Sequence, residues 1–405
     1  MNLTEVSDKK SINDFLNVPK QLYSNDEAWV CPLDIDINRI FDPGYNPMFN
    51  EGEAIRWVLK SEEGELIGRI AAFYNLKKAK ATGQMIGGAG FFEVVEDKDA
   101  AFMLFDTAIS WLKDRGMLGL DAPINFGENE NHWGLLVKGF VQQAYGMPYH
   151  KKYYKAFFEE YGFQNYFEQY SYHKDVASVT EFPERFMKIA TRVERKPGYT
   201  FKHADFGNIE KFVLDLVTVF NSAWSVFKKD FTPLDPIKVK ESFEESKFIL
   251  DEDLIWFAYH EGKPIAFYII IPDLNQILKH FKGKLNLWGK IRFYYYKQRK
   301  VMTRMRGSVA GTDPAYQNIG IESVIFKRLF EVYRKKTYYK ELELSWVGDY
   351  NPKMISIYEA LGAKHAKTHI TYRYLFDRTK PFVRFKDEAE VEMKVKNINP
   401  DKNQI

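Results

Sequence analysis

The residues Gln317-Asn318-Ile319-Gly320-Ile321 lie at the centre of the stretch that decides the fold, which runs from Arg306 to Phe376. A strand-like run, Gly307 to Thr312, precedes them, and helical spacing of apolar residues continues after them to about Lys335. A glycine in the turn that opens a helix leaves backbone N–H groups unpaired at the positive end of the helix dipole. We therefore predict that this turn binds a pyrophosphate. The alternative is a strand-to-helix turn that needs one glycine for its shape.

A second set of residues follows downstream. A predicted strand, Glu341 to Val347, leads to Asn351, and Tyr358 comes seven residues later, ahead of Leu361-Gly362. Asn351 is followed by a proline, an order that is typical of the start of a helix. A last strand is predicted from His365 to Leu375.

Together these residues resemble the pattern of the GNAT (GCN5-related N-acyltransferase) family. In that family, Gln/Arg-x-x-Gly-x-Gly/Ala binds the pyrophosphate of acyl-CoA, and an Asn and a Tyr follow. The resemblance implies that acyl-CoA, as co-substrate, is contacted by Gln317, Asn318, Ile319, Gly320, Ile321 and Asn351. Glu322 departs from the pattern, because the family prefers Gly or Ala there. A carboxylate beside a pyrophosphate is unfavourable unless its side chain turns away.

Length and composition limit the class of protein. A chain of 405 residues exceeds what one core normally holds, so two domains are expected. The net charge of +3 is too small to imply a nucleic-acid partner without a local concentration of charge, and the single cysteine, Cys31, excludes an internal disulfide. The start, MNLTEVSDKK, lacks the apolar region of a signal peptide, and the longest apolar run, Pro264 to Pro272, is too short to cross a bilayer. We expect the protein in the cytoplasm or on the cytoplasmic face of a membrane.

The order of predicted elements occurs twice, about 200 residues apart. Each copy reads strand, hairpin, strand, helix, strand, helix, glycine and strand. The predicted fold class is α/β, with two tandem GNAT-like units that each have a mixed, mostly antiparallel central sheet flanked by helices. The predicted parts are an N-terminal unit (1–180), a linker (181–198), a C-terminal unit that binds acyl-CoA (199–378) and a charged tail (379–405).

The first copy differs at both positions that define the site. Glu96-Asp97-Lys98-Asp99 replaces the glycine-bearing turn, and its carboxylates would repel a pyrophosphate. Phe158 stands where the second copy has Tyr358. We interpret the first copy as a degenerate unit that serves as a scaffold or as half of a substrate cleft, in preference to a second catalytic centre.

An insertion at 274–304 combines positive charge with apolar residues. No acidic residue lies between Asp273 and Asp313, and the basic residues of this interval are Lys279, Lys282, Lys284, Lys290, Arg292, Lys297, Arg299, Lys300, Arg304 and Arg306. Aromatic and aliphatic residues alternate with them. The pattern predicts a helical hairpin on an anionic membrane surface. Two alternatives remain open, namely RNA binding and a charged face whose aromatic residues pack on the core.

Several blocks, taken in order, resemble the bacterial ceramide synthase-like acyltransferases. They include Gly90-Phe91-Phe92-Glu93, Ala122-Pro123-Ile124-Asn125-Phe126-Gly127-Glu128-Asn129-Glu130, Met147-Pro148-Tyr149-His150 and Glu343-Leu344-Ser345-Trp346. The resemblance implies transfer of a long acyl chain from acyl-CoA to the amine of a sphingoid base. Two alternatives are a Fem-like tandem-GNAT aminoacyltransferase that uses aminoacyl-tRNA, and a non-catalytic protein that binds acyl-CoA or lipid.

The chemistry of such a transfer selects candidate residues. An amine attacking a thioester needs a base, and the leaving thiolate needs a proton. We predict Glu343 as the base and Tyr358 as the acid, with a tyrosine packed on the sheet as the alternative for Tyr358. Predicted contacts to the amine substrate are Asn125, Asn129, Glu130 and Trp346. No metal site is predicted, because His365 and His369 fall on one strand, where residues four apart are too distant to share a metal.

Overall fold

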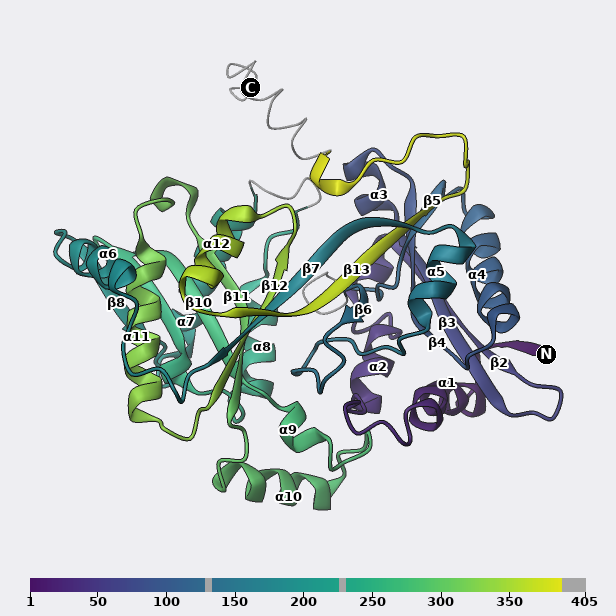
Figure 1. The fold of residues 1–405 in the computed structure, drawn as a ribbon, viewed down its shortest axis with the longest axis horizontal. Helices are drawn as coiled ribbons and strands as arrows, with labels where there is room; N and C mark the ends of the chain where they lie inside the picture. The colour runs from purple at the N-terminus through teal and green to yellow at the C-terminus, as the bar shows by residue number, and fades with distance from the viewer. Residues whose placement is uncertain (128–132, 226–230, 388–405) are drawn as a thin grey trace.

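The structure is a computed structural model that describes residues 1–127, 133–225 and 231–387. One continuous sheet of 13 strands runs through it, in the order β1-β2-β3-β4-β5-β13-β7-β12-β11-β10-β9-β8, with β6 paired to β13 (Figure 1). The pairs β4/β5 and β11/β12 are parallel, and the remaining pairs are antiparallel. This agrees with the predicted mixed, mostly antiparallel sheet.

The first half supplies seven strands, five α-helices and one short 3-10 helix (Pro47–Glu51) among the described residues. They are β1 (Asn2–Glu5), α1 (Lys9–Leu22), α2 (Asp34–Ile40), β2 (Gly52–Lys60), β3 (Leu66–Asn75), α3 (Leu76–Thr82), β4 (Ile86–Val94), α4 (Lys98–Lys113), β5 (Gly119–Ala122), β6 (Leu135–Lys138), α5 (Tyr154–Tyr161) and β7 (Gln164–Asp175).

The second half repeats the order of the main elements. Its helices and strands are α6 (Glu184–Glu194), β8 (Tyr199–His203), α7 (Ile209–Ser225), α8 (Pro236–Ser246), β9 (Ile255–His260), β10 (Lys263–Pro272), α9 (Asn275–Leu278), α10 (Leu287–Gln298), β11 (Arg304–Thr312), α11 (Ile321–Lys335), β12 (Glu341–Gly348), α12 (Pro352–Ala360) and β13 (Lys364–Leu375). The repeat β4-α4-β5-α5-β7 matches β11-α11-β12-α12-β13, as the sequence predicts.

The last strands of the two halves are exchanged. Strand β7 of the first half pairs with β12 of the second, and β13 of the second half lies between β5 and β7. Figure 1 shows these two long strands side by side across the middle of the molecule. Their side chains are exchanged too, because Tyr372 of β13 lies in the core of the first half and Tyr172 of β7 in that of the second.

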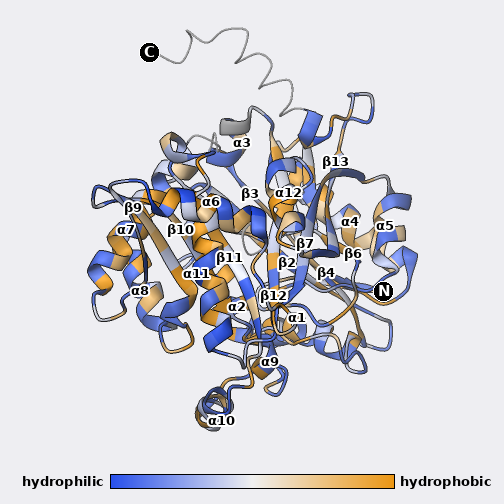
Figure 2. Ribbon diagram, turned by 60° about the vertical axis from the view of Figure 1, so that its left-hand side comes forward, coloured by the Kyte–Doolittle hydropathy of each residue, from blue (hydrophilic) through white to orange (hydrophobic). Residues whose placement is uncertain are grey.

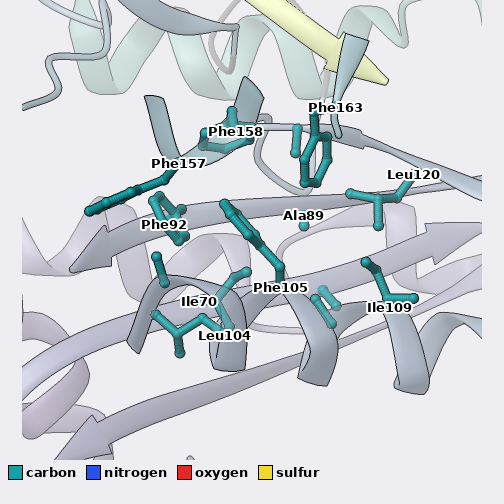
Figure 3. Close-up of a cluster of buried hydrophobic side chains, with 14 of the residues drawn as sticks. Ile70, Ala89, Phe92, Leu104, Phe105, Ile109, Leu120, Phe157, Phe158 and Phe163 are labelled. Atoms are coloured by element: carbon teal, nitrogen blue, oxygen red, sulfur yellow. The ribbon is translucent and has the colours of Figure 1, made fainter. Parts of the chain in front are cut away.

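Each half has its own large apolar core. In the first half, the aromatic rings of Phe92, Phe105, Phe158 and Phe163 lie between the sheet and helices α4 and α5 (Figure 3). In the second half, Leu342 and Leu344 of β12 pack with Ile325 and Leu329 of α11. These two cores hold the parallel pairs β4/β5 and β11/β12 in place. The candidate site lies at the second of these pairs, β11/β12.

Two predicted segments differ from expectation. The predicted linker 181–198 contains α6, which packs Ala190 and Val193 against Val324 of α11. The predicted helical hairpin contains the short α9 and one longer helix, α10, which stands away from the sheet at the bottom of Figure 1. Within the described residues, no helix has the length and apolarity required to cross a bilayer.

Candidate active site

Strands β11 and β12 diverge at the centre of the second half. Their parallel pairing runs from Arg304 opposite Glu341 to Gly307 opposite Leu344. Beyond this point both strands continue, β11 to Thr312 and β12 to Gly348, without pairing to each other. The backbone edges beyond Gly307 and Leu344 are therefore available to a ligand that lies between the two strands.

The turn after β11 presents backbone N–H groups at the start of α11. Asn318 and Gly320 have φ of 65° and 92°, so both adopt the left-handed conformation, and no side chain among the described residues caps the helix. In the described part of the chain, the N–H groups from Asn318 to Glu322 donate to no protein acceptor. A Cβ on Gly320 would lie 2.3 Å from Cγ2 of Ile189 on α6. The turn thus has the unpaired donors that a phosphate group needs.

Two charged side chains lie at this turn. Lys353, at the start of α12, donates from Nζ to Oδ1 of Asn318 over 2.6 Å. Glu322 is half-buried in the first turn of α11 and makes no ion pair within the described residues.

Asn351 is exposed, and its Oδ1 accepts a hydrogen bond from Met354 N at 3.2 Å. Asn351 is therefore an N-cap of α12 in this structure, and a contact to acyl-CoA stays a prediction.

Tyr358 lies on α12, beside the point where the strands diverge. It is buried, and its ring centroid is 5.6 Å from that of Tyr172. Its hydroxyl interacts with that of Tyr268, which lies 3.1 Å from the position that a Cβ on Gly307 would take. Burial raises the pKa of Tyr358 to about 12, although Tyr268 lowers it, so the phenol is protonated at neutral pH. A protonated phenol at this position is a possible proton donor.

Glu343 faces the opposite side of β12. Leu342 and Leu344 join the core that contains Tyr358, so the alternation of the strand turns Glu343 to the other face. Both carboxylate oxygens of Glu343 accept from Nζ of Lys367 on β13, at 2.6 and 2.5 Å, and both side chains are buried. Burial lowers the pKa of Lys367, and the charge of Glu343 opposes this shift. The predicted base is thus held in a buried ion pair.

Further polar residues line the same face at the junction of the two halves. Arg306 is the register neighbour of Glu343, and its Nε donates to Ser345 Oγ at 3.0 Å. His369 Nε2 donates to Pro148 O at 3.1 Å, with its ring 4.6 Å from that of Trp133. Among the described residues, His369 Nδ1 and Ser171 Oγ, both buried, have no hydrogen-bond partner. Their side chains come from both halves, so the local sequence could not show that they meet.

The predicted contacts to the amine substrate divide into three cases. Asn125 accepts from Phe91 N at 3.0 Å and supports the bulge of β4, where Phe91 has φ of 51°. Trp346 packs near Trp133, 6.1 Å between ring centroids, and is half-buried. Asn129 and Glu130 lie outside the described residues. The substrate roles of all four residues stay predictions.

A comparison with solved structures identifies the fold. A tandem GNAT protein from the clavulanic acid biosynthesis pathway, solved without AcCoA, aligns over 94% of this chain and 99% of its own, with a TM-score of 0.53 and 10% identity. The chain has a tandem GNAT fold. The glucosamine N-acetyltransferase region of a fungal multi-domain β-N-acetylglucosaminidase also aligns, over 92% of this chain and 38% of its own, with a TM-score of 0.53 and 11% identity. The predicted fold class is confirmed.

Sequence comparison also finds relatives that match nearly the whole chain. The bacterial ceramide synthase of Caulobacter vibrioides (strain NA1000 / CB15N) is 25% identical over 378 residues, 92% of this chain and 97% of that protein. Protein YghO of Escherichia coli (strain K12) is 25% identical over 371 residues, 90% of this chain and 93% of that protein. The predicted resemblance to bacterial ceramide synthase is confirmed. No protein-family model matches the chain.

The first GNAT unit lacks the open turn of the second. Asp97 caps α4 with its own side chain, which accepts from Ala100 N at 3.0 Å. Phe158 is fully buried and stacks on Tyr372, with ring centroids 5.4 Å apart. The helix start that could hold a phosphate in α11 is therefore already capped in α4. The role of the first unit as a scaffold or as half of a substrate cleft stays a prediction.

The described residues contain no group of three or more His, Cys, Asp and Glu side chains placed to hold a metal ion. His365 packs against Tyr170 and Tyr172 on one side of β13, whereas His369 is buried on the other side next to Trp133. The two histidines do not converge on a common ligand position.

Proposed function

We propose that the protein is an acyl-CoA-dependent N-acyltransferase that moves a long acyl chain to the amine of a sphingoid base. The observation that carries the proposal is the uncapped start of α11 beside the divergence of β11 and β12, with Tyr358 at that point. A pyrophosphate fits the unpaired N–H groups from Asn318 to Glu322, and Lys353 adds a cation. The pantetheine arm would then extend between the two diverging strands toward Tyr358.

The proposed reaction uses both faces of the sheet. The amine attacks the thioester carbon, and the backbone of β11 beyond Gly307 supplies donors for the developing oxyanion. When the tetrahedral intermediate collapses, the carbon–sulfur bond breaks and Tyr358 gives its proton to the thiolate. The amine loses a proton to Glu343, directly or through water. Because both oxygens of Glu343 accept from Lys367, this transfer requires the Lys367 ammonium to move off one oxygen. After product release, the proton on Glu343 returns through solvent to the Tyr358 phenolate, which restores both groups.

The acceptor class is inferred from similarity and from the polar junction. A relative that aligns over most of the chain is named bacterial ceramide synthase. We infer that the amine and hydroxyl groups of the base bind near Glu343, where the buried atoms Ser171 Oγ and His369 Nδ1 have no hydrogen-bond partner among the described residues. A sphingoid base resides in membranes, so cytoplasmic location with peripheral contact through 274–304 belongs to this proposal. The small overall charge gives no support to a nucleic-acid substrate.

Product analysis tests the acceptor. Purified protein is incubated with palmitoyl-CoA and either sphinganine, 3-ketosphinganine, glucosamine or lysine, and the products are identified by mass spectrometry. We expect an N-palmitoyl product with one or both sphingoid bases and none with the two polar amines. Acylation of glucosamine or lysine would contradict a sphingoid base as the acceptor and would indicate a polar amine. Tight binding of palmitoyl-CoA without turnover on any amine would indicate a protein that binds acyl-CoA but does not catalyse transfer.

A further inference from the structure

Helix α10 carries a continuous stripe of exposed apolar side chains. The stripe consists of Leu287 (72% exposed), Trp288 (74%), Ile291 (53%), Tyr294 (64%) and Tyr295 (58%). These positions follow the spacing i, i+1, i+4, i+7 and i+8, which places them on one face of a helix. Gly289 and Phe293 lie on the other face and are buried in a small core with Phe281 and Leu278. The helix therefore turns its larger apolar face toward solvent.

Cations border this stripe on both sides. By the same helical spacing, Lys290 lies along one edge and Arg292 along the other. Lys297 lies on the same edge as Lys290, but its Nζ donates to Phe248 O. No acidic residue occurs between Asp273 and Asp313. Of the basic residues in this interval, Arg304 and Arg306 turn inward and are buried, and the others remain exposed or half-buried. The resulting surface is apolar in the middle and positive at its edges.

We propose that α10 lies flat in the interface of an anionic membrane, with the stripe among the acyl chains and its cations on lipid phosphates. Trp and Tyr prefer this boundary, because their rings are apolar and each carries a polar group. Lysine and arginine stems cover apolar surface while their charges stay in water, which suits both edges. The aliphatic residues Leu287 and Ile291 within the stripe favour a lipid surface over RNA, since bases stack on aromatic rings or guanidinium planes.

Hydrogen bonds at both ends of the insertion attach it to the first half, so a membrane-bound α10 would be connected to the junction of the two halves. Arg304 donates to Gln142 O at 3.1 Å and to Gln143 O at 3.2 Å, and Asp273 Oδ1 accepts from Tyr145 N at 2.7 Å. Asn275 Nδ2 also donates to Gln143 O at 3.0 Å. The insertion thus begins and ends on a segment of the first half. Figures 1 and 2 both show α10 projecting beyond α9, so it would reach a surface before the sheet does.

Vesicle binding tests this inference without any turnover, so its result is separate from that of the proposed reaction. The full chain is mixed with vesicles of phosphatidylcholine containing about 30% phosphatidylglycerol, or with vesicles of phosphatidylcholine alone, and sedimented. We expect binding to the anionic vesicles that is weakened by added salt. A triple variant, Trp288→Ser/Ile291→Ser/Tyr295→Ser, should lose at least about tenfold in partition. Lys290→Glu/Arg292→Glu should lose a similar factor on anionic vesicles only.

Leu214 on α7 and Ile237 on α8 provide the matched control, because they are 61% and 69% exposed and lie outside the insertion. Leu214→Ser/Ile237→Ser should bind vesicles as the unaltered protein does. All variants are compared by thermal unfolding to confirm that they fold. The inference is overturned if the unaltered protein does not bind anionic vesicles, if the triple variant binds as well as the control, or if the variants affect only binding to RNA or to another protein.

Discussion

At the scale of single residues, the ion pair between Glu343 and Lys367 shows what sequence could and could not reveal. Glu343 stands out in the sequence as an acid on a strand near the turn, and the structure places it beside the divergence of the strands. Its partner lies on β13 and reaches it across β7. No local pattern predicts this contact, because it depends on the exchange of strands between the halves.

The buried pair has a consequence for stability. Glu343→Gln should lower the free energy of unfolding by about 3–5 kcal/mol, because it leaves the Lys367 charge buried without a partner. Glu343→Gln/Lys367→Met should recover much of this loss, since both charges are removed. Urea unfolding of the two single variants and the double variant measures the coupling. Additive losses from the two single changes would show that the pair does not act as a unit.

Two buried histidines make stability depend on pH. Burial lowers the pKa of His150 and of His369 to about 3. In the unfolded chain these histidines take up protons near pH 6.5. The stability that depends on their staying neutral is therefore complete above that pH and is lost as the pH falls toward 3. Each histidine contributes about 1.4 kcal/mol per pH unit in this window. The free energy of unfolding should therefore fall between pH 7 and pH 5.

His150→Gln should reduce that fall, because one of the two groups no longer titrates. His203→Gln is the matched control, since the His203 side chain is 46% exposed rather than buried. Denaturant unfolding of the three proteins at pH 7 and pH 5 makes the comparison. The same pH dependence in His150→Gln and in the unaltered protein would contradict the assignment.

At the scale of elements, most of the helices and strands around the site could be predicted, because their apolar residues follow clear periods. The strand before the turn, α11, β12 and β13 all occur within a few residues of their predicted bounds. The elements α6 and α8 were not predicted. Helix α6 lies in a stretch that the repeat left as a linker, and its packing against α11 involves residues more than 100 positions apart. Lys353 lies two residues after Asn351 in the sequence, but only the fold brings its Nζ to Asn318.

The start of α11 gives opposite predictions for two charged residues. Lys353→Ala should raise the KM for acyl-CoA by roughly fivefold with kcat little changed, because a cation near the phosphates is lost. Glu322→Ala should lower the KM, since a carboxylate at the turn is removed. Steady-state kinetics over a range of palmitoyl-CoA concentrations measures both. Lys335→Ala, at the far end of the same helix, is the control. Equal KM values in all four proteins would argue against phosphate binding at this turn.

At the scale of the whole molecule, the two units were predicted from the repeated order of elements, but the exchange of their last strands was not. Strands β7 and β13 occupy equivalent places in the two repeats, and each spans 12 residues. The order of the sequence alone predicts that each of these strands pairs with strands of its own half. The choice between the two pairings depends on packing between distant residues, such as Tyr372 against Phe158.

The exchange predicts that neither half folds alone. A fragment of residues 1–180 would lack β13 next to β5, and one of residues 181–405 would lack β7 next to β12. Each fragment expressed alone should aggregate, whereas co-expression should yield a soluble complex of both. Size-exclusion chromatography and co-purification through a tag on one fragment test this. A soluble monomer of residues 1–180 that unfolds cooperatively would contradict the structural role of the exchange.

The measurement that tests the central claim most directly is thiol release from palmitoyl-CoA, with and without sphinganine or its 3-keto form. It compares the unaltered protein with Tyr358→Phe and with Tyr172→Phe, a matched control in the same aromatic cluster. We expect release that depends on a sphingoid base, and a kcat about 100-fold lower in Tyr358→Phe only, with the KM for palmitoyl-CoA little changed. Base-dependent release that is equally fast in Tyr358→Phe would contradict the role of the acid. No base-dependent release from protein that binds palmitoyl-CoA would contradict the proposed reaction.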